Sequence, residues 1–353
     1  MPCPGRGETK MLNPKLKLNP KIFNEDVEQV PIRKGFGQGL LAAGEADKNV
    51  VALCADLTES TQMIFFKEKF PERFVEVGVA EQNLVTIASG MAAMGKIPFC
   101  SSYAMFSPGR NWEQIRTTIA YNDRPVKIVG SHAGISVGPD GGTHQALEDI
   151  ALMRVMPNMD VISPCDAIEA KKATLALVKS GKPGYLRLAR EKTPIITTEE
   201  TPLQIGQAEI YWMPDVGLAQ VGIIATGGLL HHALVAAKEL ESPPSAHSGG
   251  GGEGVKTKVM NLSSIKPIDV KAVVALAKEC KAIVTVEEHQ IAGGMGSAVA
   301  EVLAQNFPVP IEFIGVRDKF GQSGTPDELV EHYGMGKDSI KDAVKKVLKR
   351  KLT

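Results

Sequence analysis

One stretch of the chain decides its fold class: residues 126–154 run VKIVGSHAGISVGPDGGTHQALEDIALMR. The apolar run at 126–132 predicts a buried strand, and the amphipathic pattern at 144–154 predicts a helix. A glycine-rich loop joins the two. Strands that alternate with helices in this way build a parallel sheet with helices on both faces. Because such sheets bind ligands in the loops at the carboxyl ends of their strands, this loop is the first candidate site.

The same alternation continues on both sides of this stretch. In the first half of the chain we expect further strands at 50–56, 73–78, 97–103, 160–164 and 185–190, and helices at 83–95, 113–122 and 166–181. In the second half we expect strands at 217–227, 256–262, 281–289 and 311–316, and helices at 229–240, 269–280, 296–307 and 341–351. The helix at 83–95 is apolar all round and is expected to be buried. The sequence thus predicts an α/β protein with two doubly wound units.

Changes in composition mark the expected domain boundaries. Residues 1–25 are rich in Pro, Lys and Asn, which predicts an N-terminal arm or a disordered leader. The first α/β domain is expected at 26–195, a linker at 196–206 and the second α/β domain at 207–353. Within the second domain, the Gly/Ser-rich stretch 242–254 follows a predicted helix and precedes a predicted strand, so we expect a flexible loop there.

Charge and cysteine usage exclude several classes of protein. The 353 residues carry 40 Lys+Arg and 40 Asp+Glu, so the formal net charge is zero. This balance argues against a general nucleic-acid binder and against a polybasic membrane binder. No apolar run is long enough to span a membrane, and the N-terminus lacks the apolar core of a secretory signal. The five cysteines form no CxxC pair, which favours reduced thiols and a cytoplasmic location.

The first candidate catalytic residue is Glu81, in the segment VGVAEQN at 77–83. This glutamate follows a predicted strand and begins the apolar helix, so we expect it at a buried helix N-terminus. The helix dipole favours a carboxylate at that place, whereas burial favours the protonated carboxyl. The alternative is a capping acid with no part in any chemistry.

The glycine-rich loop itself contains two histidines and an aspartate. His132, Asp140 and His144 could converge on a hydroxylated substrate as hydrogen-bond donors and acceptors. Their spacing matches no common zinc pattern, so we expect no metal site in the loop. The alternative is a structural loop with surface histidines.

Aromatic residues cluster in the segment SSYAMFSPGRNWEQIR at 101–116, although aromatics make up only 5% of the chain. Tyr103, Phe106 and Trp112 follow a predicted strand, where aromatic rings can stack on a flat heterocycle. Core packing is the alternative explanation for the cluster.

Several cations complete the candidate residues. Arg110 closes the aromatic segment, while Arg187 and Arg190 stand at the end of the strand predicted at 185–190. Residues three apart on a strand face opposite sides, and Arg190, nearer the carboxyl end, is the better ligand candidate. Arginine with a serine hydroxyl is a common way to hold a phosphate, and Arg33 and Ser60 supply further groups of this kind. The alternative for each arginine is a solvated surface charge.

Taken together, these segments resemble the C-terminal half of transketolase, a thiamine-diphosphate enzyme of the pentose phosphate pathway. The resemblance runs from about residue 30 to the end of the chain. It is densest in ADLTEST (55–61), VAEQN (79–83), GPDGGTHQALEDIALMRVMPNMDV (138–161) and YLRLAR (185–190), while VEEHQIAGGMGSAV (286–299) and KFGQSGTPDELV (319–330) resemble the family's C-terminal domain. The family has three α/β domains, and this chain resembles only the second, pyrimidine-binding domain and the third.

The resemblance implies how the chain contacts the cofactor. Glu81 matches the glutamate that bonds N1′ of the aminopyrimidine, a catalytic role that favours the imino form of the ring. Phe106 matches the aromatic residue that stacks on the pyrimidine, but a third family aromatic falls at Gly109, which is a departure from the pattern. The implied cofactor contacts are Asp56, Leu57, Glu81, Tyr103 and Phe106.

The resemblance also implies a sugar-phosphate site. His132, Asp140 and His144 match residues around the sugar hydroxyls, and His144 is also implied to be catalytic. The implied substrate contacts are Arg33, Ser60, His132, Asp140, His144 and Arg190. The implied reaction transfers a two-carbon ketol unit from a ketose phosphate to an aldose phosphate.

One part of the family's active site is missing from this sequence. The first family domain carries a GDG segment and a downstream Asn that hold Mg²⁺ and the diphosphate, and no GDG occurs here. The resemblance therefore implies a separate N-terminal, diphosphate-binding subunit that holds the Mg²⁺ and shares the thiamine diphosphate, with two copies of each chain as the expected assembly. The leader and the pattern from residue 11 onward favour a natural subunit over a fragment of a longer chain.

Three alternatives stay open at this point. Deoxyxylulose-phosphate synthase has a similar THQ segment, but normally carries the first domain on the same chain. The β subunit of 2-oxo-acid dehydrogenases also lacks the first domain, but should show no GPDGGTHQ loop. A non-catalytic homologue that serves as an assembly partner is the third, and the presence of Glu81, His144 and the phosphate arginines argues against it.

Overall fold

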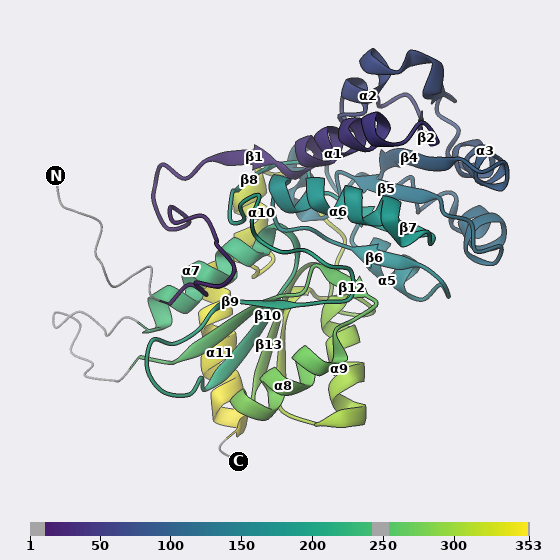
Figure 1. The fold of residues 1–353 in the computed structure, drawn as a ribbon. Helices are drawn as coiled ribbons and strands as arrows, with labels where there is room; N and C mark the ends of the chain where they lie inside the picture. The colour runs from purple at the N-terminus through teal and green to yellow at the C-terminus, as the bar shows by residue number, and fades with distance from the viewer. Residues whose placement is uncertain (1–10, 242–253, 352–353) are drawn as a thin grey trace.

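The computed structural model describes residues 11–241 and 254–351, and these fold into two packed α/β units (Figure 1). Each unit is built on its own mainly parallel sheet with helices on both faces. The predicted fold class, two doubly wound α/β units, is therefore confirmed.

The first sheet has seven strands in the order β12–β6–β7–β5–β4–β2–β3. They are β2 (Val50–Cys54), β3 (Phe74–Glu76), β4 (Ile97–Tyr103), β5 (Lys127–Ser131), β6 (Asp160–Ile162), β7 (Gly184–Arg187) and β12 (Ser264–Lys266). All neighbours are parallel except β12 and β6. Every residue of β2 is buried, and successive residues belong to different hydrophobic clusters on the two faces, as a strand covered on both sides requires.

Helices cover both faces of this sheet. They are α1 (Ile32–Ala46), α2 (Ile64–Lys69), α3 (Glu81–Ala93), α4 (Trp112–Gln114), which continues as a π-helical turn (Ile115–Ala120), α5 (Asp149–Arg154) and α6 (Ala167–Ser180). Helices α1, α2 and α6 pack on one face, and α3, the π-helical turn and α5 pack on the other. Short 3₁₀ turns lie at Pro71–Arg73 and Ile135–Asp140.

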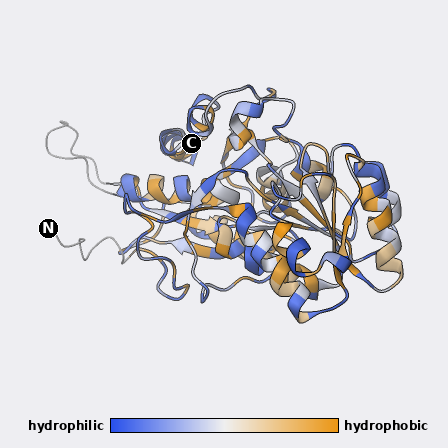
Figure 2. Ribbon diagram, turned by 90° about the horizontal axis from the view of Figure 1, so that it is seen from above, coloured by the Kyte–Doolittle hydropathy of each residue, from blue (hydrophilic) through white to orange (hydrophobic). Residues whose placement is uncertain are grey.

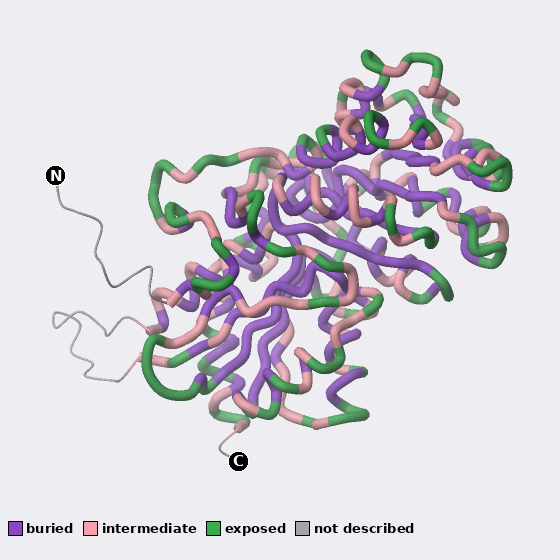
Figure 3. The backbone as a smooth tube through the Cα atoms, viewed as in Figure 1, coloured by how far each residue is buried: buried purple, intermediate pink, exposed green. Residues whose placement is uncertain are grey.

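The second sheet has five strands in the order β14–β13–β10–β11–β9. Its elements are β9 (Glu209–Trp212), β10 (Val221–Ala225), a 3₁₀ turn (Gly227–Leu229), α7 (Leu230–Glu241), β11 (Thr257–Asn261), α8 (Val270–Cys280), β13 (Ile283–Gln290), α9 (Met295–Asn306), β14 (Ile311–Val316), α10 (Pro326–His332) and α11 (Lys337–Lys351). Only β9, at the edge, is antiparallel to its neighbour. Hydrophobic residues gather on the central strands and the inner helix faces (Figure 2), and the strands are buried while the connecting turns are exposed (Figure 3).

The two units are joined by more than the linker. Strand β12, from the second half of the chain, pairs antiparallel with β6 at the edge of the first sheet. The backbone of Ser163 also donates a hydrogen bond to the carbonyl of Ser263 at 2.8 Å. One hydrophobic cluster contains residues of α3 and α5 together with residues of α8 and α9. The second unit therefore completes both the edge and part of the core of the first.

Residues 11–25 of the expected N-terminal arm pack against the second unit. Leu12, Leu16 and Ile22 are buried in the cluster that α7 and α11 form on the second sheet. Leu12 also forms an isolated antiparallel bridge with Trp212. The arm then leads into β1 (Gln29–Pro31), which pairs with β8 (Lys192–Pro194) as a separate two-stranded sheet. Residues 1–10 lie outside the described residues, as does the expected flexible loop at 242–254 apart from Gly254.

Helix α1 was not expected from the sequence because it contains four glycines, which weaken helix propensity. Two of these glycines have a packing reason. A Cβ on Gly35 would lie 1.8 Å from the carbonyl oxygen of Ala167, and one on Gly39 would lie 2.8 Å from Cβ of Thr174. The glycines thus let α1 lie directly against α6.

Two predicted helices differ from the structure. The helix expected at 144–154 begins only at Asp149, because the preceding residues belong to the glycine-rich loop. The helix expected at 83–95 is not buried all round: Ile87 in the middle of α3 is exposed, and so is Met94, the residue that follows α3, which is 83% exposed. No helix in the described ranges has the length and apolar character needed to cross a membrane.

Candidate active site

The candidate residues gather at one edge of the first sheet. Strands β2, β4, β5 and β7 are neighbours and parallel, so their carboxyl ends lie side by side. Asp56 follows β2, Tyr103 ends β4, and His132 follows β5. Arg190 was expected at the end of the strand, but it lies on the following loop, three residues beyond the end of β7. This edge is where parallel α/β sheets bind their ligands.

Four rings form a cluster at this edge. The Tyr103 ring stacks on His132 with centroids 4.0 Å apart and lies 6.1 Å from the Phe106 ring. The His144 ring stands edge-on to Phe106 at 5.4 Å and to Tyr103 at 6.3 Å. The structure therefore brings together two predicted aromatic residues and both predicted histidines.

His132 is held in an unusual backbone conformation. Its φ of 55° lies in the left-handed region, which few residues other than glycine adopt. Its ring is buried, with Nδ1 2.9 Å from the Ser131 hydroxyl. Burial, followed by the positive charges of Arg33 and Arg190, lowers the pKa of His132 to about 3. The imidazole is therefore neutral at physiological pH and offers one donor and one acceptor.

Glu81 is the first residue of α3 and is only 3% exposed. Ser102 on β4 donates from its hydroxyl to Glu81 Oε1 at 3.3 Å, and Arg110 donates to Oε2 at 3.0 Å. Asn111 fixes the backbone by donating to the Glu81 carbonyl at 2.9 Å. The predicted position at a buried helix N-terminus is confirmed, and no side chain caps the helix there.

Arg110 is the site residue whose role the sequence did not show. Its guanidinium carbon lies 4.1 Å from the centroid of the Phe106 ring while Nη1 pairs with Glu81. The two groups implied to hold the aminopyrimidine are thus bridged by one side chain. The third family aromatic residue is replaced by Gly109 in this chain. Any side chain would be crowded at this position, because a Cβ would lie 1.9 Å from the carbonyl oxygen of Met105.

Two further arginines, Arg33 and Arg190, lie near His132 of the ring cluster. Arg33 donates to the backbone carbonyl of Arg190, and Arg190 donates to the carbonyl of Val137 at 2.6 Å. Asp140 Oδ1 lies 3.5 Å from Arg190 Nη1, so the predicted substrate aspartate makes an ion pair with the predicted phosphate arginine. The Nε of Arg33 is buried without a hydrogen-bond partner in the described residues. Two guanidiniums with unused donors form a place for an anion.

The glycine-rich loop is fixed by residues of the second unit. Gln145 donates from its side-chain amide to the carbonyls of Ile135 and Gln322, each at 3.0 Å. The buried carboxylate of Glu288, on β13, accepts a hydrogen bond from the Ser136 backbone N–H at 2.5 Å. Burial raises the pKa of Glu288. The sequence did not show this support, because the partners lie more than 150 positions apart in the chain.

Other candidates have structural roles. Arg187 is buried and donates to Asp149 at 2.8 Å, and the Tyr185 hydroxyl donates to the same carboxylate oxygen at 2.7 Å. Arg187 therefore belongs to a buried ion pair with Asp149. Trp112 donates from its indole nitrogen to the carbonyl of Leu152 at 2.9 Å, which agrees with the core-packing alternative.

Three predicted residues on the β2 side are less closely tied to the cluster. Asp56 is exposed with a left-handed φ of 59°, and its N–H donates to Glu76 at 2.7 Å. Leu57 is half-buried against the cluster of α1 and α2. Within the described ranges, no hydrogen bond or ion pair joins Ser60 to Arg33 or Arg190. The contact of these three residues with cofactor or substrate stays a prediction.

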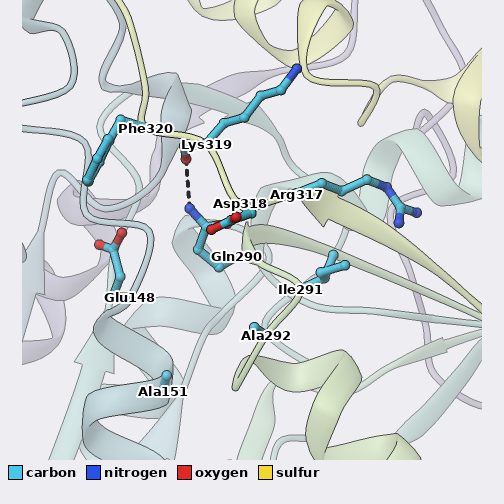
Figure 4. Close-up of a pocket in the computed structure, with 9 residues that line it drawn as sticks. All are labelled: Glu148, Ala151, Gln290, Ile291, Ala292, Arg317, Asp318, Lys319 and Phe320. Atoms are coloured by element: carbon cyan, nitrogen blue, oxygen red, sulfur yellow. Dashed lines mark hydrogen bonds between the residues drawn. The ribbon is translucent and has the colours of Figure 1, made fainter.

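A cavity of about 490 Å³ opens beside Glu81 and is lined also by Val79, Gln82, Asn83 and Arg110. A larger cavity of about 590 Å³ lies elsewhere, between Glu148 and Ala151 of the first unit and the loops after β13 and β14 (Figure 4). None of the predicted site residues lines it. On its wall the side-chain amide of Gln290 is bonded to the backbone of Lys319 and Asp318.

Comparison with known families covers nearly the whole described chain. The family described as the transketolase pyrimidine-binding domain matches residues 28–195, and the transketolase C-terminal domain matches residues 211–340. The transketolase C-terminal section of Methanocaldococcus jannaschii is 42% identical over 90% of this chain and 96% of its own length. The 6-deoxy-6-sulfo-D-fructose transketolase subunit of a Clostridium strain is 37% identical over 93% of this chain and 98% of its own length.

Longer relatives and solved structures agree with these matches. Human transketolase is 33% identical over 90% of this chain, which corresponds to 49% of the human protein. A solved split gene transketolase, described as an inactive beta4 tetramer, superposes with a TM-score of 0.81 and 39% identity over 91% of this chain and 99% of its own. Campylobacter jejuni transketolase shares the fold, with a TM-score of 0.74 at 20% identity over 92% of this chain and 50% of its own.

Proposed function

The chain belongs to the transketolase family, and on that basis we propose that it is the C-terminal subunit of a split, thiamine-diphosphate-dependent transketolase. Together with a separate N-terminal subunit it would transfer a two-carbon ketol unit from a ketose phosphate to an aldose phosphate. The relatives named as transketolase sections or subunits are matched over 95–98% of their own length, which supports a stand-alone C-terminal subunit. The buried free thiols of Cys54, Cys100, Cys165 and Cys280 support a cytoplasmic location.

The observation that carries the proposal is that the Glu81 carboxylate and the face of the Phe106 ring are placed to contact one planar group together. A planar cationic group, the Arg110 guanidinium, already contacts both at once. An aminopyrimidine needs the same two contacts, a carboxyl at its N1′ edge and an aromatic ring on its face. The residues present therefore fit the pyrimidine end of the cofactor. When bound, thiamine diphosphate supplies the nucleophilic carbon that takes up the ketol unit.

The side chains of this subunit would act on protons and on binding. Glu81 would hold a proton at N1′ of the aminopyrimidine, and Ser102 would keep its carboxyl in place through the 3.3 Å hydrogen bond. His132, which is neutral, and His144 would exchange hydrogen bonds with sugar hydroxyls beside the ring cluster. Arg33 and Arg190 would hold the terminal phosphate.

The diphosphate end of the cofactor has no counterpart in the described residues. No group of three His, Cys, Asp or Glu side chains there is placed to hold a metal ion. An N-terminal subunit would supply the Mg²⁺ and diphosphate site. Its docking surface is proposed to include the segment just before α3, next to Glu81, where Val79 is 70% exposed. Two copies of each subunit would complete two sites.

The anion site supports one further substrate class. The Clostridium relative is named for a sulfonated sugar, and the relative from Phocaeicola vulgatus is named for apulose 4-phosphate. Two guanidiniums suit a sulfonate as well as a phosphate, since both groups present three terminal oxygens that share negative charge. Sugar phosphates are the proposed substrates, and the sulfonated ketose is the second candidate donor.

Reconstitution tests the proposal. The purified chain is mixed with a diphosphate-binding subunit, thiamine diphosphate and Mg²⁺, and ketol transfer between xylulose 5-phosphate and ribose 5-phosphate is measured. We expect activity with both subunits and none with either alone. Activity of this chain alone, or no transfer with several diphosphate-binding subunits and with the sulfonated donor, would contradict the proposal.

A further inference from the structure

We propose that Arg110 occupies the aminopyrimidine position of the cofactor-free chain and that the cofactor must displace it in order to bind. This inference rests on the proposed function, since it takes the pyrimidine site as its premise. It starts from one observation: a single guanidinium touches both groups that would recognise the ring.

The geometry of Arg110 imitates that of the ligand. The edge of the planar guanidinium donates to Glu81 Oε2 at 3.0 Å, and its face lies over the Phe106 ring at 4.1 Å. An aminopyrimidine uses its edge toward the same carboxyl and its face toward the same ring. Because one face of the Phe106 ring cannot stack on two planar groups at once, the two modes of occupancy exclude each other.

The side chain of Arg110 is free to move while its surroundings are fixed. It is 50% exposed, and the described residues give its guanidinium no ion pair other than that with Glu81. Its backbone N–H is bonded to the Phe106 carbonyl at 2.9 Å. Asn111, next in the chain, is buried and bonded to Glu81 and Ser107, so it cannot follow. Only the Arg110 side chain can swing out, into the open cavity beside Gln82 and Asn83.

Displacement has a cost that the ligand must offset. Because the guanidinium in the ion pair with Glu81 is 50% exposed, the pair contributes little, and a cation over an aromatic face adds a comparable amount. Removing Arg110 should therefore strengthen binding of a pyrimidine probe by roughly three- to tenfold, the range that two contacts of this strength allow. If the Arg110 side chain instead contacted the bound pyrimidine ring, its removal would weaken binding.

Thiamine itself is a suitable probe, because it carries the aminopyrimidine but not the diphosphate, whose site lies outside this subunit. Its dissociation constant is measured on the full chain by ligand-observed NMR for wild type, Arg110→Ala and Arg110→Met. The methionine keeps the aliphatic stem and the fold while it removes the guanidinium. Arg116→Ala is the matched control, since Arg116 is an exposed arginine on the following π-helical turn.

We expect both Arg110 variants to bind thiamine three- to tenfold more tightly than wild type, and Arg116→Ala to bind as wild type does. Glu81→Ala should abolish the signal, which places the probe at this site. Equal or weaker binding by both Arg110 variants would overturn the inference and leave the proposed function standing. No thiamine binding by any variant, together with failed reconstitution, would overturn both.

Discussion

Arg33 donates a hydrogen bond from its guanidinium to the backbone carbonyl of Arg190, 157 positions later in the chain. The contact places two arginines from α1 and from the loop after β7 in one wall of the site. Asp140 forms an ion pair with Arg190 at 3.5 Å, through Nη1 of the guanidinium. An anion that enters therefore meets two cations already fixed by backbone contacts.

Arg190→Ala should raise KM for phosphorylated sugars by roughly 10- to 100-fold in the reconstituted enzyme, with a smaller effect on kcat. Charge-assisted hydrogen bonds to a phosphate contribute about 1.5–3 kcal/mol, and they are made in the ground state and the transition state alike. Steady-state kinetics with xylulose 5-phosphate and with hydroxypyruvate, which has no phosphate, checks this. Equal damage to both donors would indicate a structural role and refute the phosphate assignment.

Glu81→Gln should leave the fold intact and lower turnover by more than roughly 100-fold, because an amide cannot supply a proton at N1′. The amide keeps the size of the side chain and can still accept from Ser102. Circular dichroism and the melting temperature serve as folding controls. Near-normal turnover of the reconstituted variant would contradict a catalytic role for this carboxyl.

The isolated chain should bind thiamine diphosphate weakly, and Mg²⁺ should not improve the affinity. The described residues offer no cluster of metal-binding side chains, so the charge of the diphosphate has few partners in this subunit. Titration calorimetry with and without Mg²⁺ measures this directly. Tight, Mg²⁺-dependent binding by the chain alone would mean that it carries a complete cofactor site.

The stretch 243–253 should be replaceable by a short turn without loss of stability or activity. The residues that flank it already meet. The N–H of Val255, just before β11, donates to the carbonyl of Leu240, in the last turn of α7, at 2.9 Å. Loop closure therefore costs little. Gly254 should be retained, because a Cβ there would lie 2.6 Å from the Glu241 carbonyl oxygen. The melting temperature and the activity of the reconstituted enzyme are compared with wild type. A large loss of subunit association would show that the stretch belongs to an interface.

His132 should make the folded chain sensitive to acid. Its pKa is lowered from the ordinary 6.5 to about 3, so the folded state binds fewer protons than the unfolded state between these values. Its contribution to stability is full above pH 6.5 and is lost as the pH falls toward 3. His132→Asn keeps a residue that tolerates the left-handed φ of 55° and removes the titrating group.

We therefore expect the free energy of unfolding of His132→Asn to fall less steeply between pH 6.5 and pH 4 than that of wild type. Urea titrations at several pH values measure the slope. His332→Asn, which removes an exposed imidazole on α10, is the control. Parallel slopes for wild type and His132→Asn would show that this histidine is not the acid-sensitive group.

Much of the sheet could be predicted because buried parallel strands are short apolar runs. The expected strands at 97–103 and 311–316 coincide with β4 and β14, and the others overlap their strands with errors only at the ends. Elements without that signal were missed. Strand β12 has three residues and pairs with a sheet formed by the other half of the chain, and α1 carries glycines whose purpose is contact with α6.

The residues of the candidate site could be predicted about as far as the strands of the sheet could. Tyr103, His132 and Arg190 follow neighbouring strands, so the alternation of strands and helices was enough to expect them at one edge. The direction of a side chain could not be predicted in this way. Whether Arg187 or Arg190 faces the ligand edge depends on where β7 ends, and the pairing of Arg110 with Glu81 joins two segments 29 positions apart through a turn of irregular shape.

The amino-acid sequence by itself determined the fold class, the family resemblance and the set of residues available for chemistry, because hydrophobic period and motif spacing are local properties. Only the tertiary structure decided that Gln322 and Glu288, from the second unit, bond the glycine-rich loop at Gln145 and Ser136. It also decided that Asp140 pairs with Arg190 and that Arg110 lies where a flat ring would bind. These contacts depend on how two sheets pack against each other. Such packing is set by the summed burial of distant segments, and no short stretch of sequence encodes it.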